Sequence, residues 1–99
     1  MELAIMNYIQ KVRNRLSLKI DVESELLDLY TLIIFLRGTS VTLEDIHDAW
    51  SIWRTNTKPD HSAIIPFDEL SLEVQELDRE YAVAVKDIAL ELFSEQKSA

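Results

Sequence analysis

Histidine is the side chain that most often exchanges protons near neutral pH, and this sequence of 99 residues has two, His47 and His61. Acid–base catalysis would need an orienting partner. Asp48 follows His47 directly, but successive side chains on a helix point about 100° apart. The two histidines show no HExxH or similar metal-binding spacing. The sequence also has no cysteine, no glycine-rich phosphate loop and no nucleophile elbow. We therefore expect a protein that is not an enzyme and holds no metal or other cofactor.

Aromatic and basic side chains around the histidines are better suited to binding than to catalysis. Trp53 could stack on a ring near the end of a helix, as could Trp50 one turn earlier. Arg54 and Arg79 could pair with phosphate or carbonyl oxygens. The candidate ligand-binding residues are His47, Trp50, Trp53, Arg54, His61, Phe67 and Arg79.

The same residues also have structural interpretations. Trp50 lies on an apolar helix face, where burial of an aromatic side chain stabilises the fold by about 2–3 kcal/mol. His47 and His61 could each hydrogen-bond the backbone of a loop, and Phe67 could plug that loop against the preceding helix. Arg79 would then reach a carboxylate or the loop backbone. Because interior aromatic side chains more often pack than bind, packing is the favoured interpretation for the set.

The elements that position these residues are predicted to be helices alone. One glycine and two prolines are too few for a turn-rich β-sandwich or barrel. The expected fold is all-α: a compact four-helix domain with one ordered loop between the third and fourth helices. A single domain spans residues 1–99, with an N-terminal helix pair in 1–40, a second segment in 41–90, and a fraying helix end and tail in 91–99.

Two helices are expected in the first 40 residues. The first carries an apolar stripe with spacings of four, three and four, formed by Ile5, Ile9, Val12 and Leu16. The second is capped by Asp21 and closes at Arg37, with Gly38 in a left-handed conformation just beyond it. This second helix is apolar around most of its circumference. We therefore expect it to be central, or covered by a second chain.

The third helix and the loop after it are bounded by local signals. Thr42 starts the helix as a capping box with Asp45. The helix is expected to fray near residues 55–57, because the residue before a proline avoids helical geometry. The loop at 59–66 carries Ile64 and Ile65, so we expect it to pack against the domain.

The fourth helix is predicted to start at Ser71, its cap, and to fray after Glu95. Its apolar residues are spaced like the a and d positions of a coiled coil, which suits packing along a neighbouring helix. They are Val74, Leu77, Tyr81, Val85, Ile88 and Leu92.

The charge of the chain is negative and unevenly distributed. Eighteen acidic and ten basic residues give −8, which argues against a nucleic-acid partner because phosphate backbones attract basic faces. The first twenty residues hold four bases and one acid, or +3, which leaves −11 for the rest. Ion pairing within the chain is the first interpretation of this split, contact with another subunit the second, and a membrane surface the last. A small anion held by a few local bases is compatible with it.

No targeting signal is expected. The N-terminal basic residues follow the apolar ones, which is the reverse of a secretory signal. The longest apolar stretch, 29–36, is far shorter than the ~20 residues that span a bilayer. We therefore expect a soluble cytoplasmic protein with no membrane partner.

The motifs between residues 47 and 79 resemble those of a known family. They are H-x-x-W (His47, Trp50), then H-x-x-x-x-P-F-x-x-L (His61, Pro66, Phe67, Leu70), then the pair Asp78-Arg79. This order resembles the RyR domain, a small helical module repeated in ryanodine receptors and also found in bacterial and phage proteins. The likeness covers roughly residues 41–90 and is greatest to a compact, largely uncharacterised branch in small actinobacterial and phage proteins. Two features depart from the pattern: the interval SIWRTNTKPD lacks a G-W-x-Y-G stretch, and Ser62 follows His61 where proline is usual.

The resemblance implies recognition of nucleotide-like ligands in a pocket partly formed by aromatic residues. The expected function is a non-enzymatic small binding module that recognises or sequesters such a ligand in a phage or bacterial defence setting. The alternative is a homo-oligomeric interaction or assembly module without a small-molecule ligand, because the second and fourth helices carry surplus apolar surface. Both hypotheses can hold together, because pockets often form at subunit boundaries.

Overall fold

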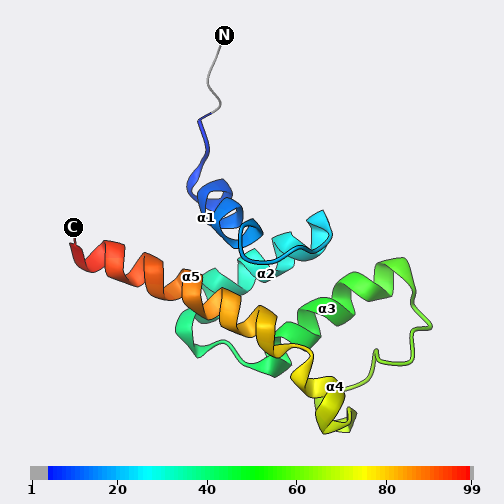
Figure 1. Ribbon diagram of the computed structural model, residues 1–99. Coiled ribbons are helices and arrows are strands. Elements are labelled where there is room, and N and C mark those ends of the chain that lie inside the picture. Colours follow the sequence, from blue (N-terminus) through cyan, green and yellow to red (C-terminus); the bar gives the residue numbers. More distant parts are fainter. Residues whose placement is uncertain (1–4, 99) are drawn as a thin grey trace.

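The computed structural model describes the backbone of residues 5–98, and within that range its regular elements are all helical (Figure 1). The α-helices are α1 (Tyr8–Ser17), α2 (Ser24–Arg37), α3 (Leu43–Thr57), α4 (Leu72–Glu76) and α5 (Arg79–Ser98). Two short 3-10 helices, η1 (Gly38–Ser40) and η2 (Phe67–Glu69), precede α3 and α4. The all-α fold class is therefore confirmed.

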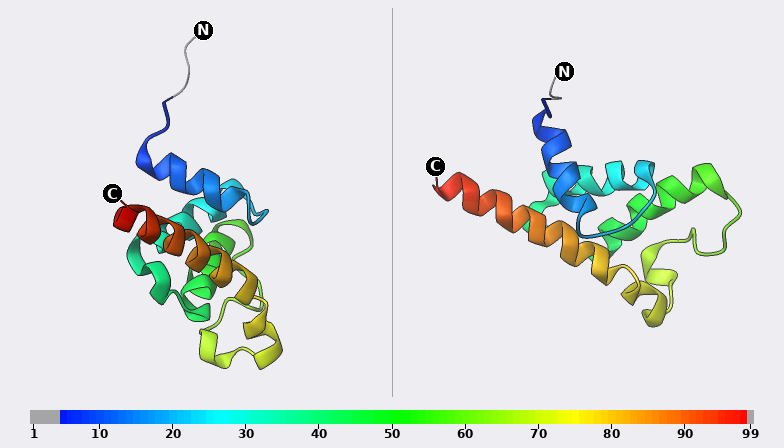
Figure 2. Two further views of the ribbon diagram at one scale, coloured as in Figure 1. Left: turned by 60° about the vertical axis from the view of Figure 1, so that its left-hand side comes forward. Right: turned by 45° about the horizontal axis from the view of Figure 1, so that its top comes forward.

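α2 lies at the centre of the fold. It contacts α1, α3 and α5, while α5 runs across the other helices and extends beyond them at its C-terminal end (Figures 1 and 2). Tyr30 of α2, Leu16 of α1, Ile46 of α3 and Val85 of α5 are fully buried in the core between these helices. α2 is central in its contacts, as predicted, but Leu32, Phe35 and Leu36 on one of its sides are exposed, so the alternative that a second chain covers it stays a prediction.

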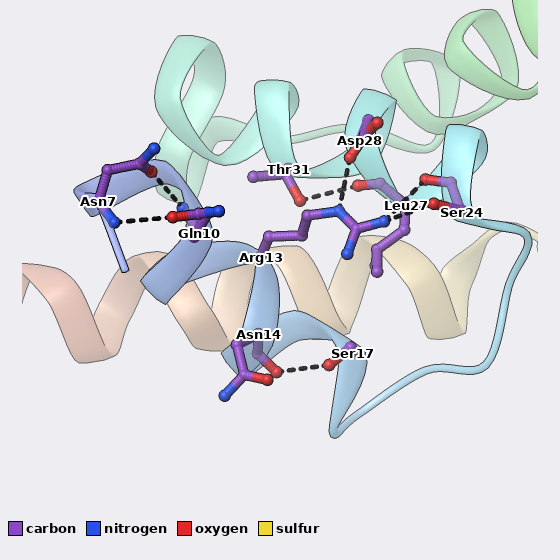
Figure 3. Close-up of polar contacts among 9 residues, drawn as sticks. All are labelled: Asn7, Gln10, Arg13, Asn14, Ser17, Ser24, Leu27, Asp28 and Thr31. Carbon is purple, nitrogen blue, oxygen red and sulfur yellow. Dashed lines mark hydrogen bonds and ion pairs between the residues drawn. The ribbon is translucent and has the colours of Figure 1, made fainter. Parts of the chain in front are cut away.

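The starts of α1 and α3 are fixed by capping boxes. At α3, the hydroxyl of Thr42 accepts a hydrogen bond from the Asp45 N–H at 3.1 Å, and the Asp45 carboxylate accepts from the Thr42 N–H at 2.9 Å, as predicted. Asn7 and Gln10 form the equivalent pair at α1, which the sequence analysis missed (Figure 3). The end of α3 at Thr57, just before Lys58-Pro59, also agrees with the prediction.

The predicted cap of α2 is wrong. The N-cap is Glu23, two residues after Asp21, and its side chain makes no capping hydrogen bond. Ile20 is buried and Val22 packs against the core. The segment between α1 and α2 therefore stays irregular over these residues, and α2 begins only after them. Tertiary burial delays the helix beyond the first residue that could cap it.

The apolar stripe of α1 is shorter than predicted. Val12 and Leu16 are buried, but Ile5 is almost fully exposed and Ile9 is partly exposed. Because α1 begins only at Tyr8, Ile5 precedes the helix and cannot continue its stripe.

The basic residues of the first segment pair with acids of the same chain. Arg13 of α1 donates to the Asp28 carboxylate of α2 at 2.5 Å (Figure 3). Arg15 forms an ion pair with Glu95 of α5, and the Nζ of Lys19 lies 3.6 Å from the Glu91 carboxylate. Ion pairing within the chain, the first interpretation of the charge split, is confirmed for these three bases, while Glu2 lies outside the described residues.

The predicted fourth helix is divided in two. Ser71 caps α4 as expected, but the helix ends at Glu76 and α5 begins at Arg79. Leu77 is exposed at this break, so its place in the apolar stripe is wrong, whereas Val85 and Ile88 are fully buried as predicted. α5 continues past Glu95 to Ser98, where a frayed end was expected, and Ala99 lies outside the described residues.

Gly38 ends α2 with φ +56° and ψ −128°, a combination that residues with a Cβ rarely adopt. A Cβ built here meets no atom within 4 Å, so only backbone strain opposes a substitution. We expect Gly38→Ala to lower the free energy of unfolding by about 1–2 kcal/mol. Urea denaturation measures this loss. Ser40→Ala, in the same 3-10 turn, serves as the control and should change little; an equal loss in both variants would contradict the backbone explanation.

Candidate functional site

A cavity of about 470 Å³ lies between α2, α3, the 58–66 loop and the junction of α4 with α5. Leu26 and Val74 contribute apolar wall. Its rings and polar groups come from Tyr30, His47, Trp50, His61, Asp78 and Tyr81. The break between α4 and α5 places Asp78 at the edge of this space, on a turn instead of on the side of a continuous helix.

His47 fastens the loop to α3. Its side chain is buried, and Nε2 lies 2.7 Å from the Ile65 carbonyl oxygen. A carbonyl oxygen only accepts, so Nε2 carries a proton and donates it to this bond. The ring stacks on Trp50 with centroids 5.8 Å apart and also touches Phe67, at 6.0 Å. The predictions that His47 bonds a loop carbonyl and that Phe67 packs the loop against the third helix are confirmed.

His61 stiffens the loop from within. Its Nδ1 accepts a hydrogen bond from the Ala63 N–H at 3.0 Å, so the neutral ring carries its proton on Nε2. The ring meets Trp50 edge-on, with centroids 5.1 Å apart. Of the two expected isoleucine contacts, only Ile64 is half-buried, and Ile65 is exposed. The loop is therefore fixed mainly by its two histidines and their ring contacts.

Tyr30 places a hydroxyl in the cavity without a partner from the chain. The residue is only 1% exposed, its ring packs at 5.6 Å on Tyr81, and its hydroxyl makes no hydrogen bond to any described residue. Burial raises the pKa of Tyr30 far above its usual value, with smaller contributions from Asp78 and Tyr81. The phenol therefore stays protonated at neutral pH and offers an O–H donor. Among the described residues, Arg54 Nε is the fully buried side-chain polar atom without a partner, so the Tyr30 oxygen keeps contact with solvent.

Asp78 supplies the complementary acceptor. Burial raises the pKa of its carboxyl to about 6, and the charge of the nearby His47 opposes this rise. The carboxyl group makes no hydrogen bond to any described residue. Burial also raises the pKa of Tyr81, with smaller contributions from Glu80 and Asp78. The cavity therefore combines aromatic walls with a donor and an acceptor that the protein itself leaves unpaired.

The predicted site residues do not all lie at the cavity. His47, Trp50 and His61 meet at the cavity, with Phe67 behind His47. Trp53 and Arg54 line a separate hollow beside the start of α2, where the Arg54 guanidinium lies 5.2 Å from the centre of the Trp53 ring. Trp53, one helical turn beyond Trp50, therefore lies beside the start of α2 and not at the cavity.

The second predicted arginine is also engaged elsewhere. Arg79 donates to the Glu76 carboxylate at 2.7 and 3.0 Å, as predicted for a residue that reaches a carboxylate, and does not line the cavity. No arginine or lysine lines the cavity among the described residues. The phosphate-holding part of the predicted site is therefore not assembled there.

Three cavity residues were missed as site candidates. Tyr30 was taken as part of an apolar helix and Tyr81 as part of an apolar stripe, and both rings do pack in that way. Asp78 was noted only beside Arg79. Acidic residues stand two positions away on both sides, so its charge does not set it apart, and the helix break that exposes it to the cavity is not visible in the sequence.

No group of three histidine, aspartate or glutamate side chains that could hold a metal ion occurs among the residues described. No helix within the described range has the length and apolar character needed to cross a membrane.

The fold and this cavity define a small all-α domain with a partly polar pocket. A family model described as a domain of unknown function, DUF7701, matches residues 4–90. The chain therefore belongs to this family. No curated protein and no solved structure matches it. The resemblance to RyR domains stays a prediction.

The raised pKa of Asp78 predicts a pH-dependent effect of its neutral replacement. The carboxyl titrates at about 6 when folded, against 3.8 ordinarily, so the folded state binds the extra proton between these values. Stability therefore falls as pH rises through this window. We expect Asp78→Asn to raise the free energy of unfolding at pH 8 by about 1 kcal/mol, a figure reduced for the partial exposure of the group. The gain should vanish near pH 4.

Thermal or urea unfolding at the two pH values measures this difference. Asp87→Asn is the matched control, because Asp87 is exposed on α5 and lies outside the cavity. A gain for Asp78→Asn that is equal at both pH values would contradict the assigned cause.

Proposed function

We propose that this chain is a non-enzymatic binding module that takes a flat, nitrogen-containing ring, such as the base of a nucleoside, into the cavity beside α3. The observation that carries the proposal is the Tyr30 hydroxyl, which belongs to a residue 1% exposed, faces the cavity and has no hydrogen-bond partner among the described residues. The cavity volume of about 470 Å³ falls within the range typical of small-molecule sites.

The chemistry of the lining matches the edge and the face of such a ring. Trp50 and Tyr81 offer aromatic surface on which a base can stack. The Tyr30 O–H can donate to a ring nitrogen or carbonyl, and the ionised Asp78 carboxylate can accept from a ring N–H or amino group. Nε2–H of His61 is a further donor without a partner among the described residues.

The charges that line the cavity favour an uncharged ligand over an anionic one. The described lining holds the carboxyl groups of Asp78 and Glu80 and no arginine or lysine. A phosphate inside the cavity would meet like charge, so a base or nucleoside fits this lining better than a nucleotide. Recognition or sequestration of a nucleotide-like ligand in a defence setting rests on the resemblance to RyR domains alone.

Fluorescence and calorimetric titration at pH 7.5 test the proposal. The chain has two tryptophans, so the Trp53→Phe protein keeps Trp50, at the cavity, as its single reporter. The titrants are adenosine, guanosine, cytidine, uridine and their 5′-monophosphates. We expect at least one nucleoside to change Trp50 fluorescence and to bind more tightly than its monophosphate.

Variants of the lining assign the site. Tyr30→Phe keeps the ring and removes the donor, so we expect affinity to fall about two- to tenfold, the effect of losing one hydrogen bond worth about 0.5–1.5 kcal/mol. Arg79→Ala is the control, because Arg79 is exposed, pairs with Glu76 and lies outside the cavity. No heat and no fluorescence change across the set would remove the proposal. Unchanged affinity in Tyr30→Phe would show that the ligand binds elsewhere.

A further inference from the structure

The outward side of α2 is apolar, although it faces solvent. Leu32, Phe35 and Leu36 of this helix are exposed, and Tyr8 of α1 and Ile52 of α3 extend the same surface. We call these five residues the α2 face. The exposed fractions of these residues range from 41% to 71%. A surface helix normally turns polar side chains outward, and α2 does not.

The α2 face is continuous. The rings of Tyr8 and Phe35 meet edge-on with centroids 5.6 Å apart. One hollow is lined by Tyr8, Leu32 and Phe35, and the next by Leu32, Leu36 and Ile52. Because Leu32 lines both hollows, the two form a single apolar surface across three helices.

Charge favours this surface for contact with another acidic chain. Two copies that each carry −8 repel one another over most approaches. At the hollows of the α2 face, however, Asp28 is paired with Arg13 at 2.5 Å and Asp45 with Arg37 at 2.9 Å. Asp48 is the one acid lining them without an ion pair among the described residues. Most of the acidic charge at this face is therefore neutralised within the chain.

The size of the surface fits a dimer. A large side chain has on the order of 200 Å² to bury, so the α2 face offers on the order of 600 Å². Exposed Ile9 lines the same hollow as Tyr8 and adds to it. Each partner of a standard interface contributes about 800 Å². α5 offers a smaller apolar surface: Val85 and Ile88 of its stripe are fully buried, and its exposed large apolar side chains are Val83, Leu90 and Phe93 among the described ones.

We infer that the α2 face is the interface of a homodimer. A two-fold interface brings the same patch of both copies together, and an apolar patch with internally paired acids is complementary to itself. Interfaces of permanent homodimers are apolar in the same way. The ligand cavity lies elsewhere on the molecule, so this inference does not depend on the proposed function.

Light scattering coupled to size exclusion tests the inference. We expect the unmodified chain to elute at micromolar concentration with twice its mass of 11.5 kDa. Leu36→Glu places a charge on the α2 face at a residue 71% exposed, so the fold is kept and the measured mass should halve. Ile52→Glu probes the same face from α3. Leu72→Glu is the matched control: Leu72 is 78% exposed on α4, outside the α2 face, and this variant should stay dimeric.

Circular dichroism of each variant checks that the helices are retained. A monomeric unmodified chain would overturn the inference and leave the α2 face for a different protein. Dimers that persist in both Leu36→Glu and Ile52→Glu would place the interface elsewhere. Dissociation of Leu72→Glu to the same extent would also overturn it, because the effect would then follow added charge and not position.

Discussion

The hydrogen bond from the buried His47 ring to the Ile65 carbonyl, 2.7 Å long, holds the loop after α3 against that helix. The same ring stacks on Trp50 and contacts Phe67, so one side chain joins helix, loop and η2. His61, held within the loop by the Ala63 N–H, is thereby brought against Trp50. The loop in turn precedes α4 and the junction with α5, where Asp78 lies. The walls of the cavity therefore depend on a polar contact made by a buried imidazole.

The carboxyl group of Asp78 at this cavity lowers the stability of the folded protein at neutral pH. A half-buried carboxyl with a pKa raised to about 6 opposes folding where it stands. Natural sequences depart from full polar satisfaction mainly at functional sites. The exposed apolar side of α2 is a second departure from a typical soluble domain, because apolar side chains normally face the core. Two acids at its edges form ion pairs within the chain. The proposed ligand binding would account for the first departure and the proposed self-association for the second, because the two involve different surfaces.

Local signals were sufficient for much of the fold. The capping box of Thr42, the positive φ of Gly38 and the end of α3 before Pro59 depend on neighbouring residues, and all were predicted. The start of α2 was not, because burial of Ile20 decides it. The break before Arg79 was missed for a similar reason, since the helical spacing of apolar residues continues through Leu77. Without that break, the place of Asp78 at the cavity could not be assigned, whereas the contact of Arg79 with a carboxylate was predicted.

Hydrogen–deuterium exchange of the His47→Phe protein tests the role of the His47 hydrogen bond most directly, because phenylalanine keeps a ring against Trp50 and removes only the donor. The amides of Ala63 and Ile64, which bond within the loop to His61, should exchange faster than in the unmodified chain, while those of α1 should not change. Nucleoside binding, where found, should weaken in the same protein. Unchanged exchange of the loop amides in His47→Phe would contradict the account, because the loop would then hold its place without this bond.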